Sequence, residues 1–182
     1  MRKALEILGH LNDSDVEWLM EQGHTRHVPM NSVLIESGIP LLSMYIMLDG
    51  QMKVLAGPAR VPVASLLAGE ILGEISIVDP RPPEVSVVAS TSSHVLEIPR
   101  AAIMKRIEES EAFAARFYLA LASYMATRLR ATTTRLGYGQ APANSNQDVL
   151  DEKGMDDITK AAGYFDGMLQ RLRTSVHANG SL

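Results

Sequence analysis

Hydrophobic residues follow a helical period at both ends of this chain and a different pattern between them. In the first segment, the apolar positions that share one helical face are Val16, Leu19 and Met20. Asn12 is a suitable N-cap, because a short polar side chain can bond the first turn, and Gly23 is a suitable left-handed stop. The pattern therefore predicts a helix from Asp13 to Gln22.

Between about Thr25 and Pro99 the apolar runs are short and are separated by Gly, Pro, Asp and Ser. Such runs predict antiparallel strands in a sandwich or roll. The runs are Ser32–Ile35, Met44–Leu48, Met52–Ala56, Val61–Leu67, Val85–Ala89 and His94–Ile98. Asp49–Gly50 predicts a two-residue hairpin, and Gly57–Pro58 marks another turn.

Helical spacing returns after the last of these runs. Pro99 suits the first turn of a helix that runs to about Ile107, and Glu111 to Leu136 is a long helical candidate. The long helix is apolar over much of its circumference, so it needs cover on two sides. We expect the sheet on one side and a second copy of the chain on the other, in a homodimer through residues 111–136. The seam is expected at Phe117, Leu121, Tyr124 and Leu129 or their immediate neighbours.

The C-terminal part divides into two further segments. Residues 137–154 are rich in Gly, Gln, Pro, Asn and Ser, with acidic residues at the end, which predicts a linker. Met155 to Arg173 predicts a second amphipathic helix. Its apolar stripe, which we expect to dock on the roll or on the partner subunit, includes Ile158, Phe165 and Leu169. The expected organisation is thus a domain over 1–136, the linker, and a helical appendage over 155–182.

Composition narrows the class of protein. Hydrophobic residues make up 46% and charged residues 21%, which is typical of a soluble globular protein. Cysteine is absent, so disulfides and thiolate chemistry are excluded, and a cytoplasmic location is expected. The net charge of −4 argues against attraction to DNA or to an anionic membrane. No apolar stretch approaches the roughly 18 residues that a membrane span needs.

The sequence contains no pattern typical of catalysis or metal binding. It has no nucleophile elbow, no Walker A loop and no dinucleotide-binding glycine triplet. His24 and His27 are three residues apart, but nearby carboxylates that would complete a metal site are missing. These histidines are therefore expected at the surface. We expect no enzyme, no catalytic residue, no metal and no cofactor.

The informative stretch runs from Ala68 to Ala89. Within it, Gly73-Glu74-Ile75-Ser76 can open a short helical turn, and backbone N–H groups after the glycine suit an anion. In its context, the region from about Leu11 to Leu136 resembles the cyclic-nucleotide-binding domain family, which includes bacterial catabolite activators and regulatory subunits of cyclic-AMP-dependent kinases. The hairpin phrase from Tyr45 to Gly50 also looks like the family. The glycine framework that carries the resemblance is Gly38, Gly50, Gly69 and Gly73. The resemblance implies an α+β fold, an antiparallel, jelly-roll-like (cupin-type) β-roll with N-terminal helices and a long dimerisation helix.

The resemblance also implies a phosphate-binding cassette. Glu74 stands where the family binds the ribose 2′-hydroxyl, and backbone N–H groups of residues 73–76 stand where it holds the cyclic phosphate. Pro83 occupies the place of the family's arginine, and Glu84 that of the following serine or threonine. The candidate ligand-binding residues are Gly73, Glu74, Ile75, Ser76, Pro83, Glu84 and Val85. Candidate purine contacts across the dimer are Thr132 and Thr133.

The effect of these two cassette differences on the binding free energy can be estimated. An arginine–phosphate contact is worth roughly 1.5–3 kcal/mol, and an added carboxylate costs about 1–4 kcal/mol. Together they correspond to roughly a hundredfold to ten-thousandfold loss of affinity. Arg81 is the nearby cation that would have to compensate, but two prolines follow it.

These observations leave three candidate functions for the chain. The first is a dimeric cyclic-nucleotide-binding-like sensor or regulatory module with altered or weak binding of cyclic AMP or cyclic GMP. The second is a ligand-free interaction or assembly module with a protein partner. The third, a transcriptional regulator, is less favoured, because the 46 residues after Leu136 offer one good helix and few basic residues.

Overall fold

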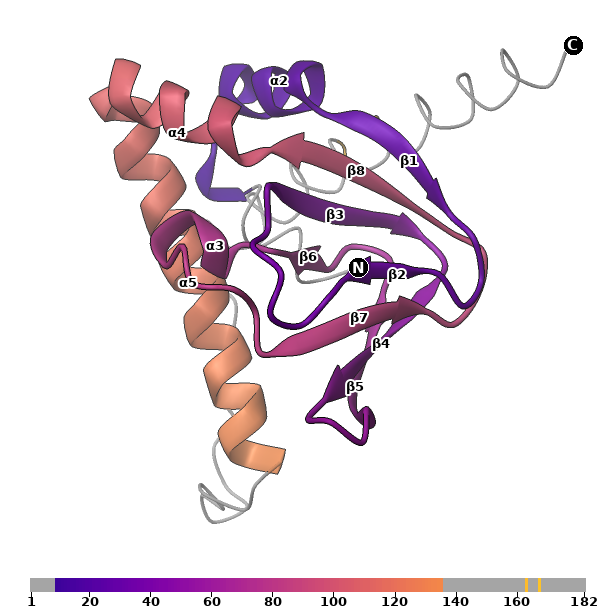
Figure 1. Ribbon diagram of the computed structural model, residues 1–182. Coiled ribbons are helices and arrows are strands. Elements are labelled where there is room, and N and C mark those ends of the chain that lie inside the picture. The colour runs from indigo at the N-terminus through magenta and orange to yellow at the C-terminus, as the bar shows by residue number, and fades with distance from the viewer. Residues whose placement is uncertain (1–8, 136–162, 164–166, 168–182) are drawn as a thin grey trace, which may run out of the picture.

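Two antiparallel sheets of four strands form a β-roll beside a long helix (Figure 1). The structure is a computed structural model that describes residues 9–135 together with Gly163 and Gly167. Its helices are α2 (Asp13–Gln22), α3 (Ile75–Val78), α4 (Arg100–Glu109) and α5 (Glu111–Arg135). Its strands are β1 (His24–Val28), β2 (Val33–Ile35), β3 (Ser43–Asp49), β4 (Gln51–Ala56), β5 (Val61–Leu67), β6 (Ile71–Leu72), β7 (Val85–Ala89) and β8 (Ser93–Pro99). The predicted α+β class is confirmed.

The strands are ordered β1-β8-β3-β6 in one sheet and β2-β7-β4-β5 in the other. All six apolar runs are strands, with ends within one residue of the prediction. The sequence pattern missed β1 and β6. Of the five residues of β1 only Val28 is buried, so this strand carries no apolar alternation. Only two residues form β6, which is too few for a periodic signal.

The prediction of a hairpin at Asp49–Gly50 is wrong, although a sharp turn is present there. This turn joins β3 of one sheet to β4 of the other, so the two strands are not paired. Gly50 has a φ of +84°, and a Cβ at this position would lie 2.2 Å from Ser93 Oγ. Glycine is therefore needed here, because the chain passes close to Ser93 where it crosses from one sheet to the other. The second predicted turn, at Gly57–Pro58, does connect a pair of neighbouring strands, β4 and β5.

The first predicted helix is confirmed, but its stop has a different physical basis. Asn12 and Asp15 form a reciprocal capping box at the start of α2. Gly23 has a φ of −84° and is extended, so the expected left-handed stop is wrong. A Cβ on Gly23 would lie 2.8 Å from the Leu96 side chain. Glycine is needed here for the close approach of α2 to β8.

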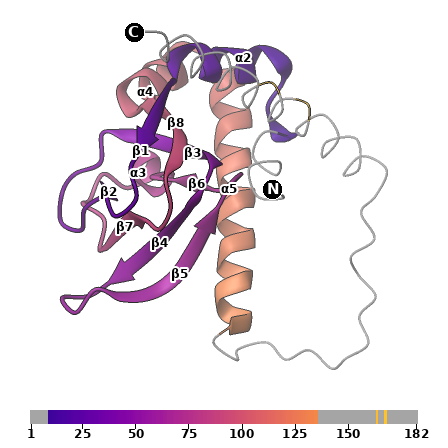
Figure 2. The same ribbon diagram turned by 90° about the vertical axis from the view of Figure 1, so that its right-hand side faces the viewer.

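The inner face of α5 packs against the roll and α2. Figures 1 and 2 show this helix running along one side of the sheets. Phe117, Leu121 and Tyr124 are at most 2% exposed and belong to the core of their own chain. The predicted seam is therefore wrong for these three residues, because their surface is already covered. Leu129 is 65% exposed and remains available to a partner.

The C-terminal helices begin where the sequence predicts. Pro99 is the N-cap residue of α4, which ends at Glu109, two residues beyond the expected end. The long helix α5 begins at Glu111 as predicted. The linker and the appendage lie outside the described residues, apart from Gly163 and Gly167, which are both helical. Within the described part of the chain, no helix has the length and apolar character to cross a membrane.

Candidate functional site

A cavity of about 550 Å³ lies between the sheets, the segment around α3, and α5. Its lining residues are Ile35, Leu41, Val54, Leu72, Gly73, Glu74, Ile75, Ser76, Asp79, Arg81, Pro82, Pro83, Glu84, Val85, Val87 and Arg128. All seven residues of the predicted cassette are therefore brought together at one cavity. The volume falls within the range of roughly 300–1,000 Å³ typical of small-molecule sites.

Glu74 is the buried charge of this cavity. Its side chain is 3% exposed, and Arg128 Nη1 of α5 donates to Glu74 Oε1 at 2.5 Å. Burial raises the pKa of Glu74, and the arginine opposes part of that shift. Burial alone would lower the pKa of Arg128, but the facing carboxylate raises it above its usual value. The pair places a charge of each sign in the cavity wall.

Sequence reasoning missed Arg128 as a site residue. The available signal was its position four residues after Tyr124, on the apolar face of α5. The guanidinium lies 5.7 Å from the centroid of the Tyr124 ring, where a cation–π contact is favourable. A cation on a face that is otherwise buried needs a partner, and Glu74 is that partner.

Tyr124 provides a second attachment between α5 and the cavity wall. Its hydroxyl donates to Ile71 O at 2.9 Å and accepts from Ile71 N at 3.1 Å. Burial and the nearby Glu74 carboxylate raise the pKa of Tyr124 to about 12. Because Ile71 lies in β6, just before the cassette, α5 is joined to this segment by two polar contacts.

Gly73 makes the tight turn that opens the cassette. Its φ is +77°, and a Cβ there would lie 2.6 Å from Leu41 Cδ2 and 2.8 Å from Ser43 O. In the turn that follows, Ser76 donates to Gly73 O through its backbone N at 3.1 Å and through Oγ at 2.6 Å. Arg100 Nε donates to Ser76 O at 2.7 Å. The Ser76 amide, one of the expected phosphate donors, is thus engaged within the turn.

The opposite end of the cassette carries the residues that depart from the family pattern. Pro83 has no N–H, and its carbonyl accepts from Gly38 N at 2.8 Å. Glu84 is exposed, and among the described residues no cation lies within ion-pair distance of it. Arg81 is 85% exposed and faces Asp79, with Nε 2.9 Å from Oδ2. The hydrogen bonds from Arg81 lower the pKa of Asp79. Arg81 is therefore already paired with a carboxylate.

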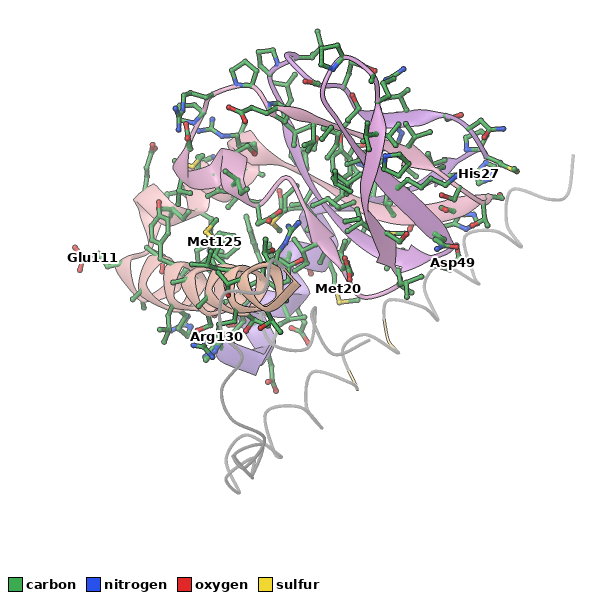
Figure 3. The ribbon with its side chains drawn as sticks, turned by 90° about the horizontal axis from the view of Figure 1, so that it is seen from below. Met20, His27, Asp49, Glu111, Met125 and Arg130 are labelled. Atoms are coloured by element: carbon green, nitrogen blue, oxygen red, sulfur yellow. The ribbon has the colours of Figure 1, made fainter. Side chains whose placement is uncertain are left out.

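Thr132 and Thr133 lie apart from this cavity. Neither lines it, and their hydroxyls donate to the backbone oxygens of Arg128 and Arg130 at 2.9 Å. Figure 3 shows Met125 on the side of α5 toward the roll and Arg130 on the opposite side. A contact of the threonines with a purine bound to a partner subunit stays a prediction.

The predicted surface histidines both lie on β1. His27 faces His94 of the neighbouring strand, with 5.0 Å between ring centroids. His24 Nε2 is 3.7 Å from Glu97 Oε2, and its side chain is 65% exposed. The part of the chain that the structure describes contains no group of three His, Cys, Asp or Glu side chains that could hold a metal ion.

Comparisons with a family model and with a curated protein point to the same family. Residues 25–110 match the sequence model of the family described as "Cyclic nucleotide-binding domain". A cAMP-dependent protein kinase regulatory subunit of Aspergillus fumigatus is 32% identical over 72 residues, which are 40% of this chain and 17% of that protein. The chain therefore matches only a small part of this curated relative.

Solved structures support the same fold. The catabolite activator protein of Thermus thermophilus has a TM-score of 0.61 and 21% identity, over 72% of this chain and 62% of that chain. A cyclic nucleotide-binding domain of Methylobacillus flagellatus has a TM-score of 0.66 and 22% identity, over 79% of this chain and 86% of that chain. The family match, the β-roll and the cavity at the cassette lead to one conclusion: residues 25–110 of this chain are a domain of the cyclic nucleotide-binding family.

Proposed function

We propose that this chain is a regulatory module that senses a small ligand in the cavity, works as a homodimer through α5, and binds cyclic AMP and cyclic GMP weakly. The observation that carries the weak binding is the pairing of charges. Arg128 faces Glu74 and Arg81 faces Asp79, while Glu84 is left at the cavity mouth. An incoming phosphate would meet no free cation among the described lining residues.

The role as a sensor is supported by the link between the cavity and α5. A ligand that contacts Glu74 perturbs the hydrogen bond to Arg128, and so acts on the helix that carries this arginine. Tyr124 and Ile71 bring a second part of the same helix to the cavity wall. Ligand binding can therefore change the position of α5, which is the element expected at the subunit interface.

Dimerisation is supported by the outward face of α5. Its exposed or half-exposed apolar residues recur at spacings of three and four, on the side opposite the buried Phe117 and Tyr124. They are Ala115, Tyr118, Leu119, Ala122, Ala126 and Leu129. Leu119 and Leu129 are 57% and 65% exposed and lie on this same outward face as the other apolar residues. A second copy of the same face would cover them with two-fold symmetry.

The remaining assignments concern the role and the location of the chain. We assign a regulatory rather than a catalytic role because the relative from Aspergillus is a kinase regulatory subunit. The assignment of a cytoplasmic location is supported by the absence of cysteine, which fits a reducing compartment. A ligand-free assembly module is the second candidate. It is favoured by the fact that Gly73 and Glu74 already have structural roles, the first in a tight turn and the second in a buried ion pair.

Calorimetric titration of the full chain with cyclic AMP and cyclic GMP tests the proposal. The expected result is a measurable but weak association, with dissociation constants well above micromolar. Dissociation constants at or below micromolar would contradict the weak binding. They would show that the two cavity arginines leave their carboxylates at little cost.

A further inference from the structure

We infer that the cavity prefers an uncharged ring compound with hydroxyl groups, of the nucleoside type, over the corresponding cyclic phosphate. This inference rests on the proposed function, because it requires that the cavity takes a small ligand. It concerns the chemical class of that ligand. The arrangement of charges, donors and apolar walls around the cavity carries it.

The ionisable groups of the cavity disfavour an anion. Three carboxylates line it, from Glu74, Asp79 and Glu84, against two guanidinium groups. Both guanidinium groups face a carboxylate, at 2.5 Å for Arg128 and Glu74 and at 2.9 Å for Arg81 and Asp79. A phosphate could recruit either arginine only by taking it from that carboxylate. The lining therefore carries an excess negative charge before any ligand enters.

The backbone around the mouth adds few donors for a phosphate. Pro82 and Pro83 are consecutive lining residues, and neither has an N–H group. On the other side, the Ser76 amide and hydroxyl both donate to Gly73 O. Anion sites in proteins are built from N–H groups that converge on the ligand. Two lining prolines and an engaged amide make this a poor anion site.

The remaining surface suits an uncharged ring compound with hydroxyl groups. Nine of the sixteen lining residues are apolar: Ile35, Val54, Leu72, Val85 and Val87 come from strands of both sheets, and Leu41, Ile75, Pro82 and Pro83 come from the segments between strands. Glu74 lies among them and is 2% exposed. A carboxylate accepts several hydrogen bonds, so Glu74 can accept from a ligand hydroxyl while it holds Arg128. Apolar walls beside a buried acceptor match the ring and the hydroxyl groups of a nucleoside.

A matched pair of probes separates the phosphate from the rest of the ligand. Adenosine and cyclic AMP are titrated calorimetrically into the full chain and into two variants, Glu84→Gln and Glu108→Gln. Glu108 is exposed on α4 and does not line the cavity, so it controls for a general change of charge. We expect adenosine to bind at least as tightly as cyclic AMP. Glu84→Gln should strengthen cyclic AMP binding about threefold to tenfold and leave adenosine unchanged, and Glu108→Gln should change neither.

The possible failures are distinguishable. Tighter binding of cyclic AMP than of adenosine would overturn the inference about ligand class, and would leave the cavity as a ligand site. An equal effect of Glu84→Gln on both probes would also overturn it, because the carboxylate would then not act on the phosphate. Absence of binding by both probes at millimolar concentration would instead contradict the proposed function.

Discussion

Arg128 and Glu74 are 54 residues apart in the sequence, and their side chains meet at 2.5 Å in the wall of the cavity. Glu74 stands at the start of α3, and Arg128 lies in the C-terminal half of α5. The contact therefore joins the ligand cassette to the helix expected at the dimer interface. A change in one of these elements can reach the other without a larger rearrangement.

Removal of the arginine should destabilise the fold. Arg128→Leu leaves the Glu74 carboxylate buried without its cation, and we expect a loss of about 2–3 kcal/mol in the free energy of unfolding. The estimate is below that for a fully buried pair because Arg128 keeps some contact with solvent. Arg130→Leu is the matched control, two residues away on the exposed side of α5, and should cost little (Figure 3). Urea denaturation followed by circular dichroism measures both, and equal losses would contradict the role of the ion pair.

The same variant should respond to pH in a defined direction. Burial raises the pKa of Glu74 above its ordinary 4.5 in the folded state. Between the ordinary and the raised pKa, the folded state binds more protons than the unfolded state, so this group adds stability as the pH falls. Arg128 lowers the pKa of Glu74, so Arg128→Leu should raise that pKa further. The variant should therefore gain more stability than the wild type as the pH falls. The difference in unfolding free energy between wild type and variant should shrink from about pH 7.5 to about pH 5. A constant or widening difference would show that Glu74 does not titrate there.

The outward face of α5 should control the oligomeric state. Leu119→Glu with Leu129→Glu places charges in the proposed interface without touching the core, and should convert the dimer to a monomer. Met30→Glu is the control, because Met30 is equally exposed but lies in the turn between β1 and β2, away from α5 (Figure 1). Light scattering coupled to size-exclusion chromatography gives the masses. A wild-type monomer at micromolar concentration would refute the dimer.

Two glycines with similar φ should tolerate alanine differently. Gly38 has a φ of +79° with nothing near its added Cβ, so Gly38→Ala should cost about 1–2 kcal/mol for the left-handed backbone alone. Gly73 has a φ of +77°, but its Cβ would meet Leu41 and the Ser43 carbonyl. Gly73→Ala should therefore cost roughly 2–4 kcal/mol, with a smaller cavity mouth. Thermal unfolding compares the two variants, and similar losses would show that the segment relaxes easily.

Local patterns predicted most strands because each has several apolar residues in a row, as in Val85–Ala89. The pattern failed where a strand depends on its neighbours, since β1 pairs with β8 through five residues of which four are exposed. It also failed at Asp49–Gly50, where the turn residues are typical of a hairpin but the two strands enter different sheets. Turn chemistry is local, whereas strand pairing is decided by the whole fold.

The site shows the same division. The cassette residues are close together in the sequence, so the resemblance to the family was enough to name all seven, and all seven line the cavity. Arg128 contacts them from another element, so its spacing from Tyr124 placed it on the apolar face of α5 but could not indicate which carboxylate it meets. The apolar circumference of α5 correctly indicated cover by the chain's own core on one side, but which residues form that side depends on how the helix is rotated. Phe117 faces its own core, and its neighbour Tyr118 faces outward.

The central claim is that cyclic nucleotides bind weakly because the cation at the phosphate end of the cavity, Arg81, is already paired with Asp79, and Glu84 adds a negative charge there. The double variant Pro83→Arg/Glu84→Ser supplies a further cation and removes the Glu84 carboxylate. Calorimetric titration with cyclic AMP should show an affinity roughly a hundredfold or more above that of the wild type, with adenosine affinity nearly unchanged. An unchanged affinity for cyclic AMP in a variant that keeps the wild-type fold would contradict the claim.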